Sequence, residues 1–363
     1  MQQSAISRTV VVAAGRFAPG HLGELTQQVP LEMVDAVLAE TGAAQRRVRD
    51  LPSRVVVYLL LAGCLFAELG YRQVWRRLVA GLDGLDLPEP SEAALTKARR
   101  RVGPAPLRVL FDLLRGPAAT LAGPVRWRGL LVCALDGTIM SVPDSPANLS
   151  VFSKQAGGAT GGSSYPMLRL LAVVACGTRT VIDAVFGPIS SGETTYARQL
   201  TGSLHAGMLI LADRNFAAGG LLAAVAERGA HLLVRAKTGT GGPNLPVLRR
   251  HRDGSYRSTF GGKVVRVVEA EITVTTTAGT ATGVYRLITT LLDHRRYPAD
   301  ALIRLYHQRW EIETAYLELK SGILGGRVLR ARTPEGIIQE TYALLIVYQI
   351  LRAAMTDATD SQR

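Results

Sequence analysis

Residues 306–320 read YHQRWEIETAYLELK, and the rest of the chain is organised around this stretch. It contains no Gly or Pro and is rich in good helix formers, so it predicts a helix. At about 100° per residue, four side chains project within roughly 60° of one another: Tyr306, Arg309, Glu313 and Lys320. This face carries an aromatic hydroxyl, two cations and a single carboxylate. A solvated helix with ion pairs between successive turns has the same composition, so the position along the chain must decide between the two interpretations.

Upstream of this helix, apolar runs alternate with helical segments. Strands and helices are predicted in the following order: strands 130–135, 166–176 and 180–186, helix 193–205, strand 208–212, helix 217–228 and strand 231–237. This is the order of an RNase H-like core, whose first strands are antiparallel and whose later strands are parallel. The predicted fold class is therefore α/β, with an RNase H-like mixed-sheet core preceded by an all-helical N-terminal domain.

The remaining parts of the chain differ in their patterns. Residues 30–117 are helical throughout, whereas residues 238–290 are rich in Gly, Thr, Val and Arg with strand-like runs. An apolar C-terminal helix is predicted at residues 334–356. Four domain segments follow from these changes in pattern: a helical N-terminal domain at 1–120, the first part of the core at 121–237, a β-rich insertion at 238–292, and the second part of the core with the C-terminal helix at 293–363.

Net charge is the most informative bulk property of the chain. The 42 Lys and Arg residues exceed the 29 Asp and Glu residues and leave a formal net charge of +13. A polyanionic partner relieves the self-repulsion of such a chain, and nucleic acid is the leading candidate, ahead of an anionic membrane surface. The longest apolar runs are too short to span a bilayer, and the three cysteines lie in apolar runs without CxxC pairing. We therefore expect a cytoplasmic protein in a reducing compartment.

One N-terminal segment has the character of a nucleic-acid reader. Ser91 caps a predicted helix with the sequence SEAALTKARRRV, residues 91–102. Its apolar residues share one face, Lys97 and Arg100 lie on the opposite face, and Arg101 lies on the flank. A basic outward face is what a major-groove reader needs, and the basic surface of an ordinary helical bundle is the alternative. We expect Lys97, Arg100 and Arg101 to contact DNA.

Two aspartates come at the ends of predicted strands. Asp136 follows the run 130–135, and Asp213 follows the run 208–212. The first and fourth strands of an RNase H-like sheet are neighbours, so both carboxylates should meet, with Glu313 added by the helix beside the sheet. Three converging carboxylates repel one another unless divalent ions lie between them. We expect two Mg²⁺ ions, for which Mn²⁺ can substitute, about 3.5–4 Å apart, to activate a nucleophile and stabilise the leaving oxygen of a phosphodiester.

Each aspartate also has a simpler interpretation. Asp136 precedes Gly-Thr and is a candidate turn former, and Asp213 precedes Arg and is a candidate for a plain ion pair. Three other carboxylates compete for a role, in a Pro-bounded loop, a hairpin strand and the first turn of a helix: Asp144, Asp183 and Glu193. The shared strand-end position of the two aspartates, together with a helix that presents one carboxylate, favours the catalytic interpretation.

The quoted helix resembles the signature of a known family. It matches the pattern Tyr, two residues, Arg, three residues, Glu, six residues, Lys of transposases of the insertion sequence four family, within the DDE class. The resemblance looks to extend over most of the chain, from about residue 20 to residue 355. It includes YRQVWRRL at 71–78, ALTKARRRVG at 94–103, LDGT at 135–138, YPMLRLLAVVACGTR at 165–179, ADRNF at 212–216 and RTPEGIIQE at 332–340.

The resemblance implies a metal-dependent DNA transposase. Three carboxylates would take the metal-binding catalytic roles: Asp136, Asp213 and Glu313. Three residues of the signature helix would contact transposon-end DNA near the scissile phosphate, unless the two cations merely balance the carboxylates: Tyr306, Arg309 and Lys320. Such an enzyme binds the terminal inverted repeats of its element, cleaves the ends and joins them to double-stranded target DNA. We expect it to work on the bacterial nucleoid, as a homodimer in the DNA complex.

One departure from the family concerns the insertion. Relatives that cut through a DNA hairpin intermediate place a tryptophan there to stack on a flipped base, and residues 238–292 contain none. An aromatic residue of another type would have to supply the stacking ring: Tyr256, Phe260 or Tyr285.

Two other classes of function were weighed against a transposase. A DNA-binding protein of transposase descent that no longer cuts would have the same fold, but it has no use for an intact acidic triad. The LDGT string suggests a phosphatase of the haloacid dehalogenase type. That class needs a nucleophilic aspartate two residues before the Asp of DGT, and Ala134 stands there.

Overall fold

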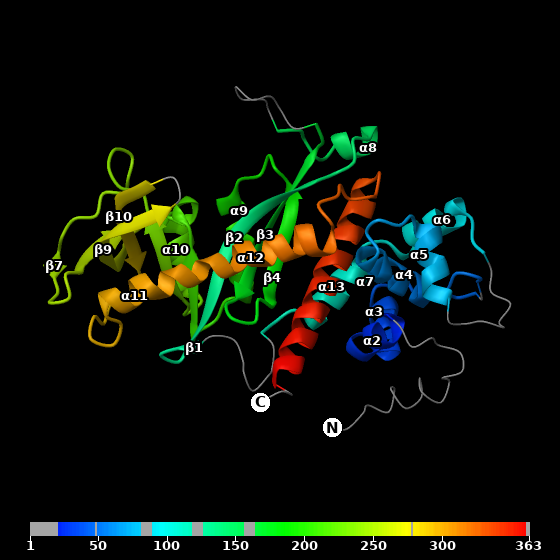
Figure 1. Ribbon diagram of the computed structural model, residues 1–363, viewed down its shortest axis with the longest axis horizontal. Coiled ribbons are helices and arrows are strands. Elements are labelled where there is room, and N and C mark those ends of the chain that lie inside the picture. Colours follow the sequence, from blue (N-terminus) through cyan, green and yellow to red (C-terminus); the bar gives the residue numbers. More distant parts are fainter. Residues whose placement is uncertain are drawn as a thin grey trace. The chain divides into compact units, whose positions relative to one another are not determined.

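A computed structural model describes residues 21–47, 49–80, 89–117, 126–155, 164–276 and 279–360. The chain forms two compact units, each assembled from more than one stretch of sequence (Figure 1). The helical unit takes its described residues from Met1–Arg115, Met140–Met167 and Leu317–Met355, and the sheet unit takes its described residues from Gly116–Ile139, Leu168–Tyr316 and Thr356–Arg363.

The helical unit confirms the helical pattern of the N-terminal sequence. Its helices are α2 (His21–Gln28), α3 (Leu31–Glu40), α4 (Ser53–Leu65), α5 (Tyr71–Val79), α6 (Glu92–Val102), α7 (Ala105–Leu114), α8 (Pro146–Leu149) and α13 (Pro334–Asp360). Helix α4 packs against α3, α5 and α6. Its residues from Val56 to Cys64 are all buried, as expected for a helix that is apolar on every side. Helix α2 had no signal in the sequence pattern.

The C-terminal segment is part of the helical unit. The side-chain amide of Gln339 in α13 donates hydrogen bonds to the carbonyl oxygens of Arg99, at 3.1 Å, and Gly103, at 2.7 Å. Further along α13, Gln349 donates to the carbonyl of Leu114 at 3.1 Å. The N-terminal helices therefore belong to the same unit as residues far downstream. The domain boundary predicted between residues 120 and 121 lies outside the described residues. None of the described helices is long and apolar enough to cross a membrane.

Helix α6 has the faces that its sequence predicts. The Oγ of Ser91 accepts a hydrogen bond from the Ala94 amide at 3.2 Å, which confirms the N-cap. The apolar side of the helix is buried, whereas Lys97 and Arg100 are exposed. Arg101 is exposed as well, and its Nη2 donates to the carbonyl of Leu51 at 2.6 Å. The helix ends at Gly103, whose φ of 66° is left-handed.

The sheet unit has the predicted RNase H-like strand order. Its strands are β1 (Arg126–Trp127), β2 (Leu130–Ser141), β3 (Met167–Ala175), β4 (Val181–Pro188), β5 (Met208–Ala212), β6 (His231–Ala236), β7 (Arg249–Arg250), β8 (Tyr256–Phe260), β9 (Lys263–Thr276) and β10 (Gly279–Thr289). They form one sheet in the order β4-β3-β2-β5-β6-β10-β9-β8-β7, with β1 paired to β2. Strands β3 and β4 are antiparallel, whereas β5 is parallel to both β2 and β6.

The β-rich insertion continues the core sheet. Strand β10 pairs antiparallel with β6, so the hairpins of the insertion extend the sheet beyond the last core strand. This pairing satisfies the backbone groups that β6 would otherwise expose as an edge. At the β8–β9 turn the backbone passes close to the start of α10 (Gly219–Glu227). A Cβ at Gly219 would lie 2.5 Å from the Cα of Gly261, so glycine is required at this contact.

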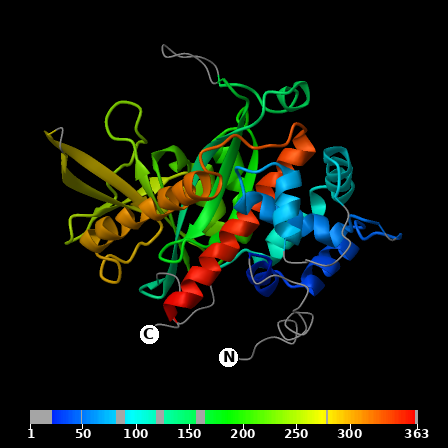
Figure 2. The ribbon, with the colours of Figure 1, turned by 45° about the vertical axis from the view of Figure 1, so that its right-hand side comes forward.

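Helices cover both faces of the sheet (Figures 1 and 2). Helices α9 (Glu193–Leu200) and α10 pack on one face, where their apolar residues share a core with alternate residues of β2, β3, β5 and β6. Helices α11 (Ala299–Tyr306) and α12 (Trp310–Leu317) cross the other face. All five residues of β5 are buried, because a strand covered on both sides contributes side chains to two cores.

The signature helix is less regular than predicted. A 3-10 turn (His307–Arg309) joins α11 to α12, and a π-helical segment (Glu318–Ile323) follows α12. In the π segment the amide of Leu324 donates to the carbonyl of Leu319, five residues back. A π-turn holds more residues than an α-turn, so the wheel of about 100° per residue stops applying before Lys320. The stretch is helical as predicted, but it is not one regular α-helix, because the helix type changes twice within it.

Candidate active site

Asp136 and Asp213 lie next to each other on paired parallel strands. Leu135 of β2 is in register with Ala212 of β5, so the two aspartates are the next residues on strands about 4.8 Å apart. Asp213 follows the end of β5 as predicted, and its Oδ1 accepts a hydrogen bond from the Asn215 amide at 2.7 Å. Asp136 is not at a strand end, because β2 continues to Ser141 after its pairing with β5 has stopped.

Arg309 links two of the three predicted carboxylates. Its Nη1 donates to Oδ2 of Asp136 at 3.1 Å, and its Nη2 donates to Oε1 of Glu313 at 2.7 Å. Its side chain is 13% exposed, so this ion pair is largely shielded from water. The 3-10 turn and α12 thus bring a cation and a carboxylate to the end of the β2–β5 pairing.

The pKa of Asp136 reflects its burial and its charged neighbours. Burial raises the pKa of Asp136 to about 6. The amide of Gly137 and the guanidinium of Arg309 oppose this shift, whereas the charges of Asp213 and Glu313 add to it. When ionised, the three carboxylates outnumber the single guanidinium that bonds Asp136 and Glu313, and this excess of negative charge favours binding of a further cation.

Two tyrosines attach the signature helices to the strands that carry the aspartates. The hydroxyl of Tyr306 donates to the carbonyl of Ala212 at 3.0 Å, immediately before Asp213. The hydroxyl of Tyr316 donates to the carbonyl of Asp136 itself at 2.7 Å. The backbone at Asp136 is thus held from α12, which carries Glu313, and the backbone just before Asp213 is held from the end of α11.

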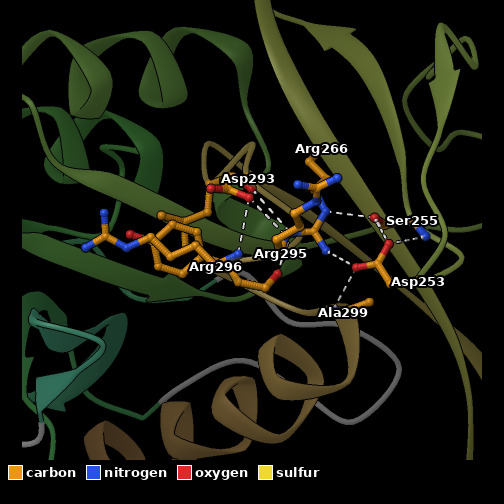
Figure 3. Close-up of polar contacts among 9 residues, drawn as sticks. Asp253, Ser255, Arg266, Asp293, Arg295, Arg296 and Ala299 are labelled. Atoms are coloured by element: carbon orange, nitrogen blue, oxygen red, sulfur yellow. Dashed lines mark hydrogen bonds and ion pairs between the residues drawn. The ribbon is translucent and has the colours of Figure 1, made fainter.

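A buried arginine fixes the start of α11 (Figure 3). Arg266 of β9 is fully buried, and it donates to Oγ of Ser255 at 2.8 Å, to Oδ2 of Asp253 at 2.6 Å and to the carbonyl of Tyr297 at 2.6 Å. The same Oδ2 of Asp253 accepts from the amide of Ala299, the first residue of α11, at 3.1 Å. Burial opposes the charge of Asp253, but the hydrogen bonds from Ser255 and the charge of Arg266 outweigh it and lower its pKa. The insertion therefore anchors the helices that deliver Glu313.

The residue types at this site fit a divalent metal ion. Carboxylate oxygens are the hard ligands that Mg²⁺ and Mn²⁺ prefer. Among the described residues, no three His, Cys, Asp or Glu side chains are grouped closely enough to hold one ion. The guanidinium of Arg309 forms ion pairs with both Asp136 and Glu313 and supplies positive charge between them.

Comparison with known proteins agrees with this geometry. The family model "Transposase DDE domain" matches residues 127–350, and "Insertion element 4 transposase N-terminal" matches residues 19–112. The chain belongs to the insertion element 4 family of DDE transposases. It is 28% identical over 334 residues to the transposase InsG for insertion sequence element IS4 of Escherichia coli (strain K12), which covers 89% of this chain and 74% of InsG. The putative transposase InsZ of the same organism is 27% identical over 207 residues, 56% of this chain and 67% of InsZ.

The family assignment confirms two expectations from the sequence. The chain is a transposase with an RNase H-like core, and its general activity is DNA transposition. DDE transposase domains generally depend on divalent metal ions.

The other residues predicted to bind DNA or to stack on a base lie in both units of this transposase. Lys320 lies in the π-helical segment, and the basic residues of α6 also belong to the helical unit. Of the aromatic residues considered for base stacking, Tyr256 is buried in the core of the sheet unit, and the guanidinium of Arg235 covers the ring of Tyr285 at 3.8 Å. Phe260 is partly buried and packs against the same core.

The three competing carboxylates have local roles in the transposase. Asp144 forms an ion pair with Lys154 at 2.6 Å, and Oδ1 of Asp183 accepts from the adjacent Ala184 amide. Glu193 lies 3.8 Å from Arg169 in an ion pair. These contacts agree with structural roles for all three.

Sequence reasoning missed two contributors to the site. Tyr316 lies three residues after Glu313, and a hydroxyl at that helical spacing was the available signal. Arg266 gave no signal, because a basic residue in a β-rich segment is normally exposed. Its burial depends on a carboxylate and two carbonyls contributed by other segments.

Proposed function

We propose that this transposase binds the terminal inverted repeats of its own insertion sequence, hydrolyses the DNA at the element ends and joins the 3′-hydroxyls to target DNA. The observation that carries the proposal is that Asp136 and Asp213 are adjacent by strand register and that Arg309 links Asp136 to Glu313. The formal net charge of +13 supports double-stranded DNA as the partner. An element has two ends, so we also propose a homodimer in the DNA complex.

In this proposal Asp136, Asp213 and Glu313 hold Mg²⁺, or Mn²⁺ in its place. Two such ions supply activation of the attacking oxygen and stabilisation of the leaving oxygen in a phosphodiester displacement. The protein contributes the positions of the ligands. Tyr316 and Tyr306 hold the backbones beside the two aspartates, and α12 holds Glu313.

The cations of the signature have separate roles in the proposal. Arg309 neutralises Asp136 and Glu313 in the DNA-free protein, and its two hydrogen bonds support this role. The hydroxyl of Tyr306 is already a donor to Ala212, which supports a positioning role for this residue. Lys320 contacts the DNA backbone near the scissile phosphate as a point charge.

The test is cleavage of DNA that carries the genomic ends flanking the gene. The purified protein is incubated with this DNA, with and without Mg²⁺, and the strands are resolved on a denaturing gel. Cleavage at the element ends only in the presence of Mg²⁺ is expected. Asp136→Asn, Asp213→Asn and Glu313→Gln should each abolish cleavage and leave DNA binding largely intact, because the amides keep the shape of the side chains but lose their charge.

Glu311→Gln is the matched control for the helix. Glu311 lies on the same helix as Glu313 but pairs with Arg179 at 2.6 Å, so its variant should cleave normally. Near-wild-type cleavage by any one of the three carboxylate variants would remove that residue from the proposed triad. If the wild-type protein binds the ends but never cuts, it is the non-cutting DNA-binding protein considered as the alternative.

A further inference from the structure

Two stretches that resemble the family, but that the proposed chemistry does not use, line one cavity in the helical unit. They are residues 94–103 in α6 and its C-terminal turn, and residues 332–340 at the start of α13. The cavity has a volume of about 750 Å³, and the described residues that line it include four arginines and one carboxylate: Arg99, Arg100, Arg330, Arg332 and Glu335. A cavity with this lining has a strong excess of positive charge.

Two of the arginines form the fixed wall of the cavity. Arg330 donates to the carbonyls of Gly63 and of Leu69, the latter at 3.0 Å, and pairs with the buried Glu340. The guanidinium of Arg99 lies 3.9 Å from the centre of the Tyr71 ring, and that of Arg330 lies 5.0 Å from the same centre. Two guanidinium groups of like charge therefore both contact the aromatic ring of Tyr71. Among the described residues, no acceptor bonds the buried Nε of Arg99.

The other two arginines are exposed at the cavity. Within the described part of the chain, neither Arg100 nor Arg332 forms an ion pair, although both lie beside the fixed cations. The backbone that carries Arg332 is held firmly. Asn148 donates to the carbonyl of Ala331 at 3.0 Å, and Ser145 donates to that of Arg332 at 2.9 Å. Arg332 therefore extends from a fixed point, which reduces the entropy lost when its guanidinium binds a ligand.

We propose that this cavity binds a backbone phosphate of DNA, held by Arg100 from the N-terminal helices and Arg332 from the C-terminal segment. The planar fork of a guanidinium matches two phosphate oxygens, so two arginines that line one cavity can bind the same phosphate group. The positive end of α13 lies at the same cavity and adds to the attraction. Glu335 also lines the cavity, and its negative charge should oppose binding of an anion.

Lys97 indicates a polymeric ligand. It is exposed on α6, one turn before Arg100, so the positive surface continues from the cavity along the helix. A DNA backbone has successive phosphates to occupy such a track, whereas a free phosphate ion fills only the cavity. This inference rests on the proposed function, since it assumes that the protein binds transposon-end DNA.

The experiment measures the affinity of the full-length protein for a duplex containing the element end, by fluorescence anisotropy over a salt series. Arg100→Gln and Arg332→Gln should each weaken binding roughly three- to tenfold and lower the slope of log affinity against log salt by about one. Glu335→Gln should strengthen binding. Arg108→Gln, on an exposed arginine of α7 outside the cavity, is the matched control and should behave as the wild type.

Further measurements distinguish DNA phosphate from inorganic phosphate as the ligand. They also distinguish failure of this inference from misfolding and from failure of the proposed function. If Arg100→Gln and Arg332→Gln have the affinity and salt slope of Arg108→Gln, the inference is overturned. It is also overturned if they lose binding of inorganic phosphate, measured by calorimetry, but keep full DNA affinity. Arg100→Lys and Arg332→Lys keep the charge without the fork and should show smaller losses, which excludes misfolding as the cause. Failure of the wild-type protein to bind or cut the duplex would instead overturn the proposed function.

Discussion

Replacing the buried aspartate of the candidate site should stabilise the metal-free transposase. Burial raises the pKa of Asp136 to about 6, from the ordinary aspartate value of 3.8. Ionised Asp136 therefore destabilises the folded protein, even though Arg309 donates a hydrogen bond to it. In Asp136→Asn the side-chain oxygen still accepts from the Gly137 amide, and the charge is gone. The free energy of unfolding should rise, although most substitutions lower it.

The expected gain follows from the pKa shift and depends on pH. A shift of about two units, at 1.36 kcal/mol per unit, corresponds to about 3 kcal/mol at pH 8. Below the unfolded pKa of about 4, Asp136 is protonated in both states, and wild-type and variant should have similar stability. As pH rises from about 4 through about 6, the free energy of unfolding of the wild-type protein falls because Asp136 ionises, whereas that of the variant does not. At pH 5 roughly half of the gain should remain.

Urea unfolding in EDTA, at pH 5 and pH 8, tests this expectation. The far-ultraviolet circular dichroism of wild-type and Asp136→Asn proteins is followed, and equal slopes against urea show that the comparison is valid. Asp300→Asn is the control. Asp300 pairs with Arg304 at the surface, chiefly by a side-chain hydrogen bond that lowers its pKa, so this variant should gain no stability. Addition of Mg²⁺ should stabilise the wild type more than Asp136→Asn, since an ion that binds the folded state shifts the equilibrium toward it.

Two results would refute the reasoning. If Asp136→Asn is no more stable than the wild type at pH 8, the folded protein does not disfavour the charge of Asp136. If the gain is the same at pH 5 and pH 8, its cause is packing and not ionisation. Either outcome would also weaken the case for a metal site, because the excess of negative charge is the reason to expect a bound cation.

Three further variants test the contacts around the site. Arg309→Met should raise the affinity of the DNA-free protein for Mn²⁺ in calorimetry, because it removes a cation that repels the metal; unchanged affinity would contradict the charge-balancing role. Tyr316→Phe should cost about 1 kcal/mol of stability and slow cleavage without changing the Kd for DNA, whereas an unchanged cleavage rate would contradict a positioning role. Arg266→Met should lower the free energy of unfolding by about 3–5 kcal/mol in urea titrations, because it leaves Asp253 without its partner, and Arg266→Lys should cost less.

The core strands could be predicted because their signal is local. Strand β5 is a continuous apolar run and β6 has an apolar centre, and the limits of both were found to within one residue. The same rule missed the second half of β2, where polar residues follow Asp136. That extension depends on the neighbouring strand, which a local pattern does not include. The adjacency of Asp136 and Asp213 was predicted from strand order and follows from the register of Leu135 with Ala212.

The amino-acid sequence alone was enough to recognise the family, the candidate carboxylates and the basic helix α6, because each is recognised from residue types and their spacing. Tertiary structure decided which charges meet. Arg309 pairs with Asp136, 173 residues away in sequence, and Arg266 is buried against Asp253 and Tyr297. It also brought residues 94–103 and 332–340 to one cavity. An arginine has the same local pattern whether it faces water, a carboxylate or a carbonyl, so only the folded chain distinguishes the three.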